Sequence, residues 1–145
     1  MQHELIEGAG AKNSHPIATS AMELLASIVE VLGPNPSFLT AYQGLWNKVT
    51  TYINEWNTAE DLVSCFVLAE GLLETFGEDA QFVVPGIISS FSMTSTYRNE
   101  YCRANTFYLL TLLFDIFPKE MEVNLAQYTE ILRNGLVRRD GDVCE

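Results

Sequence analysis

The residues of this chain whose spacing could carry chemistry are paired carboxylates. Glu70 and Glu74 lie four residues apart in an apolar helical stretch, so both would project from one face of a helix. Such a pair can transfer protons or bind calcium, but the sequence lacks the alternating oxygen ligands of an EF-hand loop. We therefore expect Glu70 and Glu74 to form a solvated helix face. An all-α enzyme that uses these two carboxylates is the least favoured alternative.

Other side chains that commonly carry catalysis are not placed for it. Neither His3 nor His15 has a cysteine, serine or carboxylate at a spacing that implies a catalytic dyad or triad. Cys65 and Cys102 lie inside apolar helical stretches, where we expect buried and inert thiols. No glycine-rich loop follows a strand, so no phosphate-binding loop is indicated. We predict that the chain is not an enzyme and has no catalytic residue, no cofactor and no metal site.

The cysteine pattern and the apolar stretches indicate the compartment. Cys65, Cys102 and Cys144 lie far apart, which argues against a disulfide framework or a zinc site and favours a reducing environment. The longest apolar stretch, residues 107–117, is interrupted by polar residues and is too short to span a bilayer. The first residues lack the basic and then apolar pattern of a signal peptide. We expect a soluble intracellular protein.

The charge of the chain restricts its partners. The formal net charge is −11, and only eight of the 145 residues are Lys or Arg. Nucleic acids and anionic bilayers bind clustered basic residues, so neither is expected as a partner. A basic protein fits this charge better. Solubility alone is the other explanation of the excess of acidic residues.

The elements that position these residues follow a pattern that occurs three times. An apolar helical run ends at Gly33, again at Gly77 and again at Pro118, and each is followed by a second helical run. From Gly33 to Gly77 is 44 residues, and from Gly77 to Pro118 is 41. Repeats of about 40–47 residues with two helices each are typical of HEAT and armadillo proteins. The sequence predicts an all-α fold, a right-handed α-solenoid of three HEAT-like antiparallel helix pairs.

The predicted boundaries follow from the bends. The segments are a weakly ordered lead-in (1–13), three HEAT-like repeats (14–57, 58–97 and 98–137) and the start of a truncated next repeat (138–145). Helices are expected over about 15–32, 37–53, 58–76, 85–91, 98–117 and 121–136. An extended segment is expected before Pro85, because proline disfavours helix at the residue before it. A single four-helix bundle is the structural alternative, and it fits six predicted helices less well.

Four short stretches resemble one known family. Residues 102–106, which lead into 108–113, resemble the start of a first HEAT helix in the importin-β (karyopherin-β) superfamily. Residues 21–25 and 81–88 resemble the openings of first and second helices in such repeats, and 139–143 resemble the polar turn that opens another. Their order and spacing are most similar to the C-terminal half of importins that carry ribosomal proteins and histones.

The resemblance implies a fragment of a nuclear transport receptor that acts as a non-catalytic scaffold. Such receptors form superhelical arrays whose second helices line a concave face, and they bind basic cargo proteins. The full-length protein would also bind the Ran GTPase and phenylalanine–glycine nucleoporins and would shuttle between cytoplasm and nucleus. No Ran site is transferred to this chain, because Ran contacts lie chiefly in N-terminal repeats of the family. A HEAT-repeat scaffold or adaptor unrelated to nuclear transport, with an assembly or cytoskeletal role, is the alternative.

The candidate contact residues are those that the predicted second helices would present. Most acidic residues fall instead on the predicted first helices and bends. The candidate protein-binding residues are Gln43, Asn47, Ser89, Glu122, Gln127 and Glu130. The terminal repeats lack polar caps, so self-association of the fragment is also expected.

Overall fold

The computed structural model describes residues 16–53, 59–96 and 98–144, with side chains described over 16–51, 61–96 and 98–136. This part of the chain is all-helical and contains no strand, as the sequence predicts. The helices are α2 (Pro16–Leu32), η1 (Pro36–Phe38), α3 (Leu39–Ile53), α4 (Ala59–Phe76), η2 (Gly77–Val83), α5 (Val84–Ile88), α6 (Phe91–Thr94), α7 (Glu100–Ile116), α8 (Pro118–Glu122) and α9 (Leu125–Cys144). The predicted lead-in over 1–13, both histidines and Thr58 lie outside the described residues.

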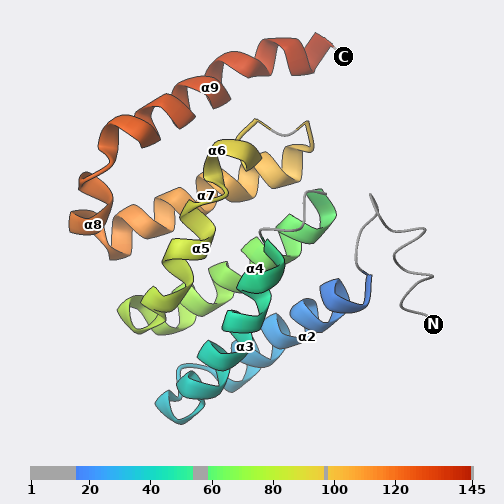
Figure 1. The fold of residues 1–145 in the computed structure, drawn as a ribbon, viewed down its shortest axis with the longest axis vertical. Coiled ribbons are helices and arrows are strands. Elements are labelled where there is room, and N and C mark those ends of the chain that lie inside the picture. The colour runs from blue at the N-terminus through green and yellow to red at the C-terminus, as the bar shows by residue number, and fades with distance from the viewer. Residues whose placement is uncertain (1–15, 54–58, 97, 145) are drawn as a thin grey trace.

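Three long helices form one layer (Figure 1). Helices α2, α4 and α7 lie side by side and run in the same direction, and α4 contacts both of its neighbours. Helices α3 and α5–α6 return across the same side of this layer, and α9 runs back beyond α7. Each long helix is therefore followed by a returning segment before the next long helix begins.

Two glycines end the first two long helices. Gly33 has φ +75° and Gly77 has φ +60°, the left-handed conformation that closes a helix and that residues with a Cβ rarely adopt. The Gly33 N–H donates to the Val29 carbonyl at 3.0 Å, which satisfies one of the last carbonyls of α2. Phe117, at φ −126° and ψ +58°, ends α7, and Pro118 opens the short helix that follows. The three predicted bends are confirmed.

Asparagines begin two of the helices. The Asn99 side chain accepts a hydrogen bond from the Cys102 N–H at 2.9 Å, and its extended backbone is that of an N-cap. In the same way the Asn35 side chain accepts from the Ser37 N–H at 2.9 Å before η1. Each cap satisfies a backbone donor that has no partner inside its own helix.

The three long helices pack through equivalent positions. We call two sets of sequence-equivalent positions on the long helices the trailing face and the leading face. The trailing faces, offset by 44 and then 41 residues, are Ile17, Ala21, Leu24 and Ile28 of α2, Asp61, Cys65, Leu68 and Leu72 of α4, and Cys102, Thr106, Leu109 and Leu113 of α7. The leading faces are Met22, Leu25 and Val29, then Phe66, Ala69 and Leu73, then Phe107, Leu110 and Phe114.

Contacts across the first junction support this correspondence. The Thr19 hydroxyl of α2 donates to the Asp61 carboxylate of α4 at 3.1 Å, and the Cys65 and Met22 sulfur atoms lie 3.6 Å apart. The trailing faces of α4 and α7 are buried along their whole length. Because apolar area is removed from water at both junctions, this repeated packing is the main source of cohesion in the fold.

The second and third returning segments differ from the predicted helices. Val84 is helical (φ −64°, ψ −50°) instead of extended, because η2 continues directly into α5 and Pro85 lies in the first turn, where its missing N–H costs no bond. The expected helix from Pro85 is divided into α5 and α6 at Ser89 and Ser90. Ser90 Oγ donates to the Ile87 carbonyl at 2.9 Å, which offers this carbonyl a partner outside a helical ladder.

The last returning segment also differs. The helix expected over 121–136 is divided into α8 and α9 at residues 123–124, and α9 continues through Cys144. The expected break at 138, where the next repeat was to begin, is therefore not a helix boundary. No proline follows Pro118 in the sequence, and a lone glycine weakens a helix by only about 1 kcal/mol without ending it.

Candidate protein-binding surfaces

All six residues predicted to contact a partner are exposed. They are Gln43 and Asn47 of α3, Ser89 at the end of α5, Glu122 at the end of α8, and Gln127 and Glu130 of α9. Helices α3 and α5 cross one side of the long-helix layer, whereas α8 and α9 lie beyond α7 (Figure 1). The structure therefore divides the six residues between two regions.

Aromatic packing positions the two candidates on α3. Trp46 is fully buried, and Tyr42 packs its ring 5.8 Å from that of Phe76 at the end of α4. Gln43 and Asn47 each follow one of these buried aromatics by one position, so their amides project away from the core. Side-chain amides so placed can both donate and accept hydrogen bonds with a partner.

The charged candidates at the other end are less suited to attract a basic partner. Glu130 forms an ion pair with Arg133, Oε1 to Nη2 at 3.0 Å, and both side chains are more than half exposed. An exposed i,i+3 pair adds little stability, but it places a positive charge beside the carboxylate. Glu122 ends α8 and does not lie in the returning helix, contrary to the prediction.

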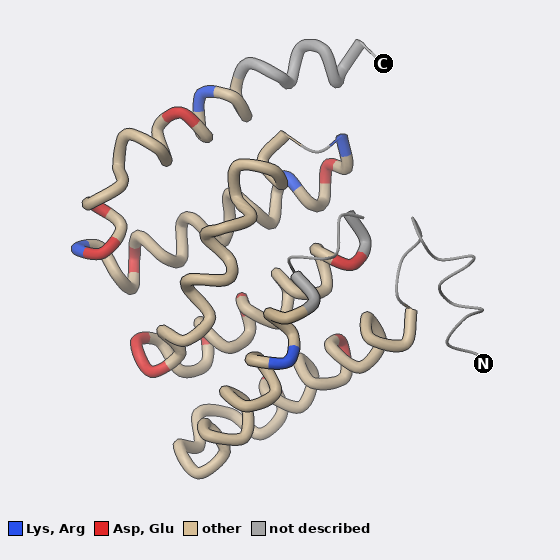
Figure 2. Tube along the Cα trace, viewed as in Figure 1, with Lys and Arg blue, Asp and Glu red and all other residues tan. Residues whose placement is uncertain are grey.

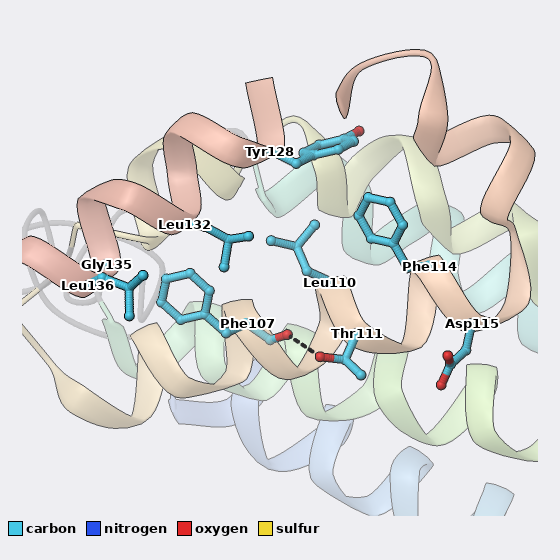
Figure 3. Close-up of a pocket in the computed structure, with 9 residues that line it drawn as sticks. All are labelled: Phe107, Leu110, Thr111, Phe114, Asp115, Tyr128, Leu132, Gly135 and Leu136. Carbon is cyan, nitrogen blue, oxygen red and sulfur yellow. Dashed lines mark hydrogen bonds between the residues drawn. The ribbon is translucent and has the colours of Figure 1, made fainter. Parts of the chain in front are cut away.

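A groove lies between α7 and α9, and the sequence did not indicate it (Figure 3). Its volume is about 550 Å³. The lining residues are Phe107, Leu110, Thr111, Phe114 and Asp115 of α7, and Tyr128, Leu132, Gly135 and Leu136 of α9. Most of these side chains are apolar, and Figure 3 shows the phenylalanines and leucines directed toward one another across the groove. None of the six predicted contact residues lines it.

A close approach of α9 to α7 closes one end of this groove. A Cβ placed on Gly135 would lie 2.2 Å from Cζ of Phe107, far inside van der Waals contact. Glycine at this position therefore allows the Phe107 ring to pack against the α9 backbone. At the other end the Tyr128 ring packs edge-on against Phe114, with ring centroids 5.9 Å apart. The two contacts hold α9 away from α7 in between.

Tyr128 is buried, and its hydroxyl makes no hydrogen bond within the described part of the chain. A buried hydroxyl without a partner costs about 1–3 kcal/mol. Tyr128 stays buried because its ring contributes apolar contacts with Phe114 that compensate for this cost.

The Glu70 and Glu74 carboxylates join α4 to α7 and do not form a purely solvated face. The Asn105 side-chain amide donates to Glu70 Oε2 at 2.6 Å, and the Tyr108 hydroxyl donates to Glu74 Oε2. The prediction of a solvated face is thus wrong for Glu70, which is half-buried, while Glu74 remains exposed. The sequence did not indicate these bonds, because their partners lie 34 and 35 residues further along the chain.

The contacts between α4 and α7 raise the pKa values of Glu70 and Tyr108. Burial raises the pKa of Glu70, the hydrogen bond from Asn105 opposes this effect, and the neighbouring Glu74 charge adds to it. The pKa of Tyr108 is also raised, chiefly because its hydroxyl donates to the Glu74 carboxylate. Both carboxylates therefore serve as hydrogen-bond acceptors between α4 and α7.

The two described cysteines are buried and unreactive in character. Burial raises the pKa of the Cys65 thiol to about 12 and that of Cys102 to about 11. Thiols so far from ionisation are poor nucleophiles, because the thiolate is the reactive form. The predicted burial of both residues is confirmed.

Acidic residues are spread over the surface and gather at the bends (Figure 2). Glu78 and Asp79 lie in η2, and Glu120 and Glu122 lie in α8. Asp61, in the first turn of α4, is by contrast fully buried. Over the ranges whose side chains are described, no group of three or more His, Cys, Asp and Glu could hold a metal ion. The same part of the chain contains no helix long and apolar enough to cross a membrane.

Comparison with known proteins adds no relative. A scan against protein-family models gives no match, and searches of curated proteins and of solved structures give none either. The similarity to the importin-β superfamily therefore depends only on the short sequence stretches described above.

Proposed function

We propose that this chain is a non-catalytic protein-binding scaffold, in which three HEAT-like antiparallel helix pairs form a segment of a right-handed α-solenoid. One observation carries the proposal: α2, α4 and α7 stack in the same direction through equivalent faces offset by 44 and 41 residues. Repeat arrays of this kind bury one continuous core between neighbours and leave an extended surface on the returning helices. That surface is suited to hold another protein.

The partner in this proposal is a basic protein. The net charge of −11 attracts positively charged chains over distances comparable to the Debye length. Gln43, Asn47 and Ser89 add exposed hydrogen-bonding groups on the returning helices α3 and α5. Charge brings the partner close, and these polar groups are expected to fix its register.

In its particular form, the scaffold is part of a nuclear transport receptor of the importin-β type that moves between cytoplasm and nucleus. The support is the similarity of residues 21–25, 81–88 and 102–106 to the helix openings of that superfamily. Ran and phenylalanine–glycine nucleoporins would then bind other parts of the full-length receptor. A scaffold for assembly or the cytoskeleton shares the same architecture and is the alternative.

Affinity capture from cell extract, with and without Ran locked in its GTP form, separates the two. The full-length protein that contains this chain serves as bait, and captured proteins are identified by mass spectrometry. We expect basic proteins to be captured and then released by Ran-GTP. Capture that Ran-GTP does not change would exclude the transport receptor and leave the general scaffold. No enrichment of basic proteins would contradict the scaffold for basic partners.

A further inference from the structure

Helices α4 and α7 share one accessible strip along the junction between them. Each helix contributes three residues at spacings of three and four, which places them on one side of that helix. The intervening side chains of α4, such as Leu68 and Leu72, are buried. We call this strip the outer face, and its residues are Val67, Glu70 and Glu74 of α4 and Tyr101, Asn105 and Tyr108 of α7.

Two hydrogen bonds fix the register of the outer face. Asn105 donates to Glu70 Oε2 at 2.6 Å and Tyr108 donates to Glu74 Oε2, so residues 35 and 34 positions apart lie side by side. Because α4 and α7 run in the same direction (Figure 1), the same offset of 34 pairs Val67 with Tyr101 near the beginning of α7. The six side chains therefore form one continuous surface.

Aromatic rings give the outer face a composition that is common in protein interfaces. Tyr101 is 77% exposed and Tyr108 is 44% exposed, and Val67 beside them is 38% exposed. Tyrosine is enriched at interfaces because its ring offers a large apolar area and its hydroxyl a hydrogen bond. These rings are accessible to a partner along the whole strip.

The two carboxylates of the outer face each keep one oxygen without a hydrogen bond. Glu70 and Glu74 accept through Oε2, and within the described part of the chain neither carboxylate forms an ion pair. Burial raises the pKa of Glu70 and the Glu74 charge adds to this effect, so the two carboxylates lie close enough to repel each other. A cation that contacts both free Oε1 atoms relieves this repulsion.

We propose that the outer face binds an arginine-containing segment of a basic protein, with one guanidinium group contacting the free oxygens of both Glu70 and Glu74. Guanidinium suits this place better than ammonium, because its planar set of N–H donors can bridge two carboxylates while its face lies against a tyrosine ring. This inference rests on the proposed function, since it names where a basic partner binds. It adds a surface on the long helices to the one on the returning helices.

Three matched peptides test the chemistry of the ligand. Each is labelled with fluorescein and alternates glycine with arginine, lysine or citrulline, and binding to the full chain is measured by fluorescence anisotropy at about 0.15 M salt. Lysine keeps the positive charge without the planar fork, whereas citrulline keeps the planar shape without the charge. We expect the arginine peptide to bind at least about threefold more tightly than the lysine peptide, and the citrulline peptide not to bind.

Charge-matched variants show where the arginine peptide binds. Glu70→Gln/Glu74→Gln removes both charges and keeps an acceptor for each of the two bonds between the helices. Glu23→Gln/Glu30→Gln on α2 changes the net charge equally at exposed sites outside the outer face. We expect the first double variant to weaken binding at least about tenfold and the second at most about twofold.

Tyr101→Ala tests the aromatic part of the surface. This residue forms neither of the two bonds that hold the carboxylates, and at 77% exposure its loss should leave the fold intact. We expect about threefold weaker binding of the arginine peptide, as for the loss of a ring that contacts a cation. This variant also keeps the proposal testable if the double variant of α4 fails to fold.

Core histones, measured with the same variants, separate this proposal from the proposed function. If the unaltered chain binds histones and the arginine peptide but the changes in the outer face weaken neither more than the α2 control does, the outer face is overturned and the scaffold for basic proteins stands. Lysine and arginine peptides that bind equally well would overturn the bridging guanidinium. No binding of either the peptide or histones at about 0.1 mM would overturn both proposals.

Discussion

Truncation of two leading-face residues, one on α4 and one on α7, tests whether the groove is open in solution. Leu73 of α4 and Phe107 of α7 are both directed toward the following layer, but only Leu73, 1% exposed, is enclosed by protein on all sides. Phe107 is partly buried and lines the groove. Leu73→Ala should leave a closed cavity, whereas Phe107→Ala should only widen a space that already opens to solvent.

The magnitudes follow from this difference. Replacing a fully buried leucine by alanine costs about 2–5 kcal/mol, which combines the lost transfer energy with the cavity. For Phe107 the loss should be about 1–2 kcal/mol, because only part of its ring is removed from water and no enclosed void forms. A cost above about 3 kcal/mol is a large fraction of the 5–15 kcal/mol that stabilises a typical domain.

Urea unfolding followed by far-ultraviolet circular dichroism gives the free energy of unfolding of each variant. Val123→Ala, at a site 80% exposed, is the control and should change it by less than about 0.5 kcal/mol. If Phe107→Ala costs as much as Leu73→Ala with unchanged denaturant slopes, α9 encloses the Phe107 ring in solution. A groove that is open to solvent at Phe107 would then be refuted.

Three further predictions concern single sites. Gly135→Ala should lower the free energy of unfolding by about 1–3 kcal/mol, since the added Cβ would meet the Phe107 ring. Gly44→Ala, with no atom within 4 Å of the added Cβ, should instead raise the free energy of unfolding by about 0.5–1 kcal/mol. Equal stabilisation of both would contradict the close approach. The raised pKa of Glu70 means that the folded state binds the proton of this carboxyl more tightly than the unfolded state does. Its contribution to stability is therefore complete below the ordinary pKa of 4.5 and is lost as pH rises through the raised pKa. Glu70→Gln should remove that part of the dependence of stability on pH, and an unchanged profile would contradict the raised pKa. In a Cys144→Ser variant, Ellman's reagent at pH 8 should label neither Cys65 nor Cys102 until urea unfolds the chain. Rapid labelling of the native protein would contradict the burial of these two thiols.

Local chemistry made much of the helix pattern predictable. Gly33, Gly77 and Pro118 mark the ends of the three long helices because left-handed glycine and the missing N–H of proline act within one turn. The buried faces also follow from three- and four-residue spacing, as Tyr42, Trp46 and Val49 of α3 show. In these cases neighbouring residues in the sequence determine the outcome.

Features that depend on distant residues could not be predicted. Glu70 has the sequence environment of a surface residue, and only the packing of α7 brings Asn105 to it. Asp61 similarly lies buried beside Thr19 of α2. The groove could not be predicted, because Phe107, Leu110 and Phe114 have the same spacing as the residues of an ordinary buried helix face. Their offset of 41 residues from buried positions on α4 was the signal that could have identified them.

The function predicted from the sequence concerns an extended surface and not a single site, and its candidate residues lie on four helices. Gln43, Asn47 and Ser89 are exposed on α3 and α5, as a role in binding requires. Glu130 lies beside Arg133, and Glu122 lies in α8, so both acidic candidates lie on an exposed surface and not in a pocket. Binding of a basic partner is therefore tested with charge-reversal variants that change the net charge equally at different exposed sites.

The most direct test of the scaffold for basic partners is isothermal titration calorimetry of this chain with core histones at 0.15 M salt. Three forms are compared: the unaltered chain, Glu122→Lys/Glu130→Lys on the predicted binding side, and Glu23→Lys/Glu30→Lys on α2, which changes the net charge equally at exposed sites. We predict saturable micromolar binding that the first double variant weakens at least about tenfold more than the second. Absence of binding at about 0.1 mM histone, or equal weakening by both variants, would contradict a specific binding surface for basic proteins.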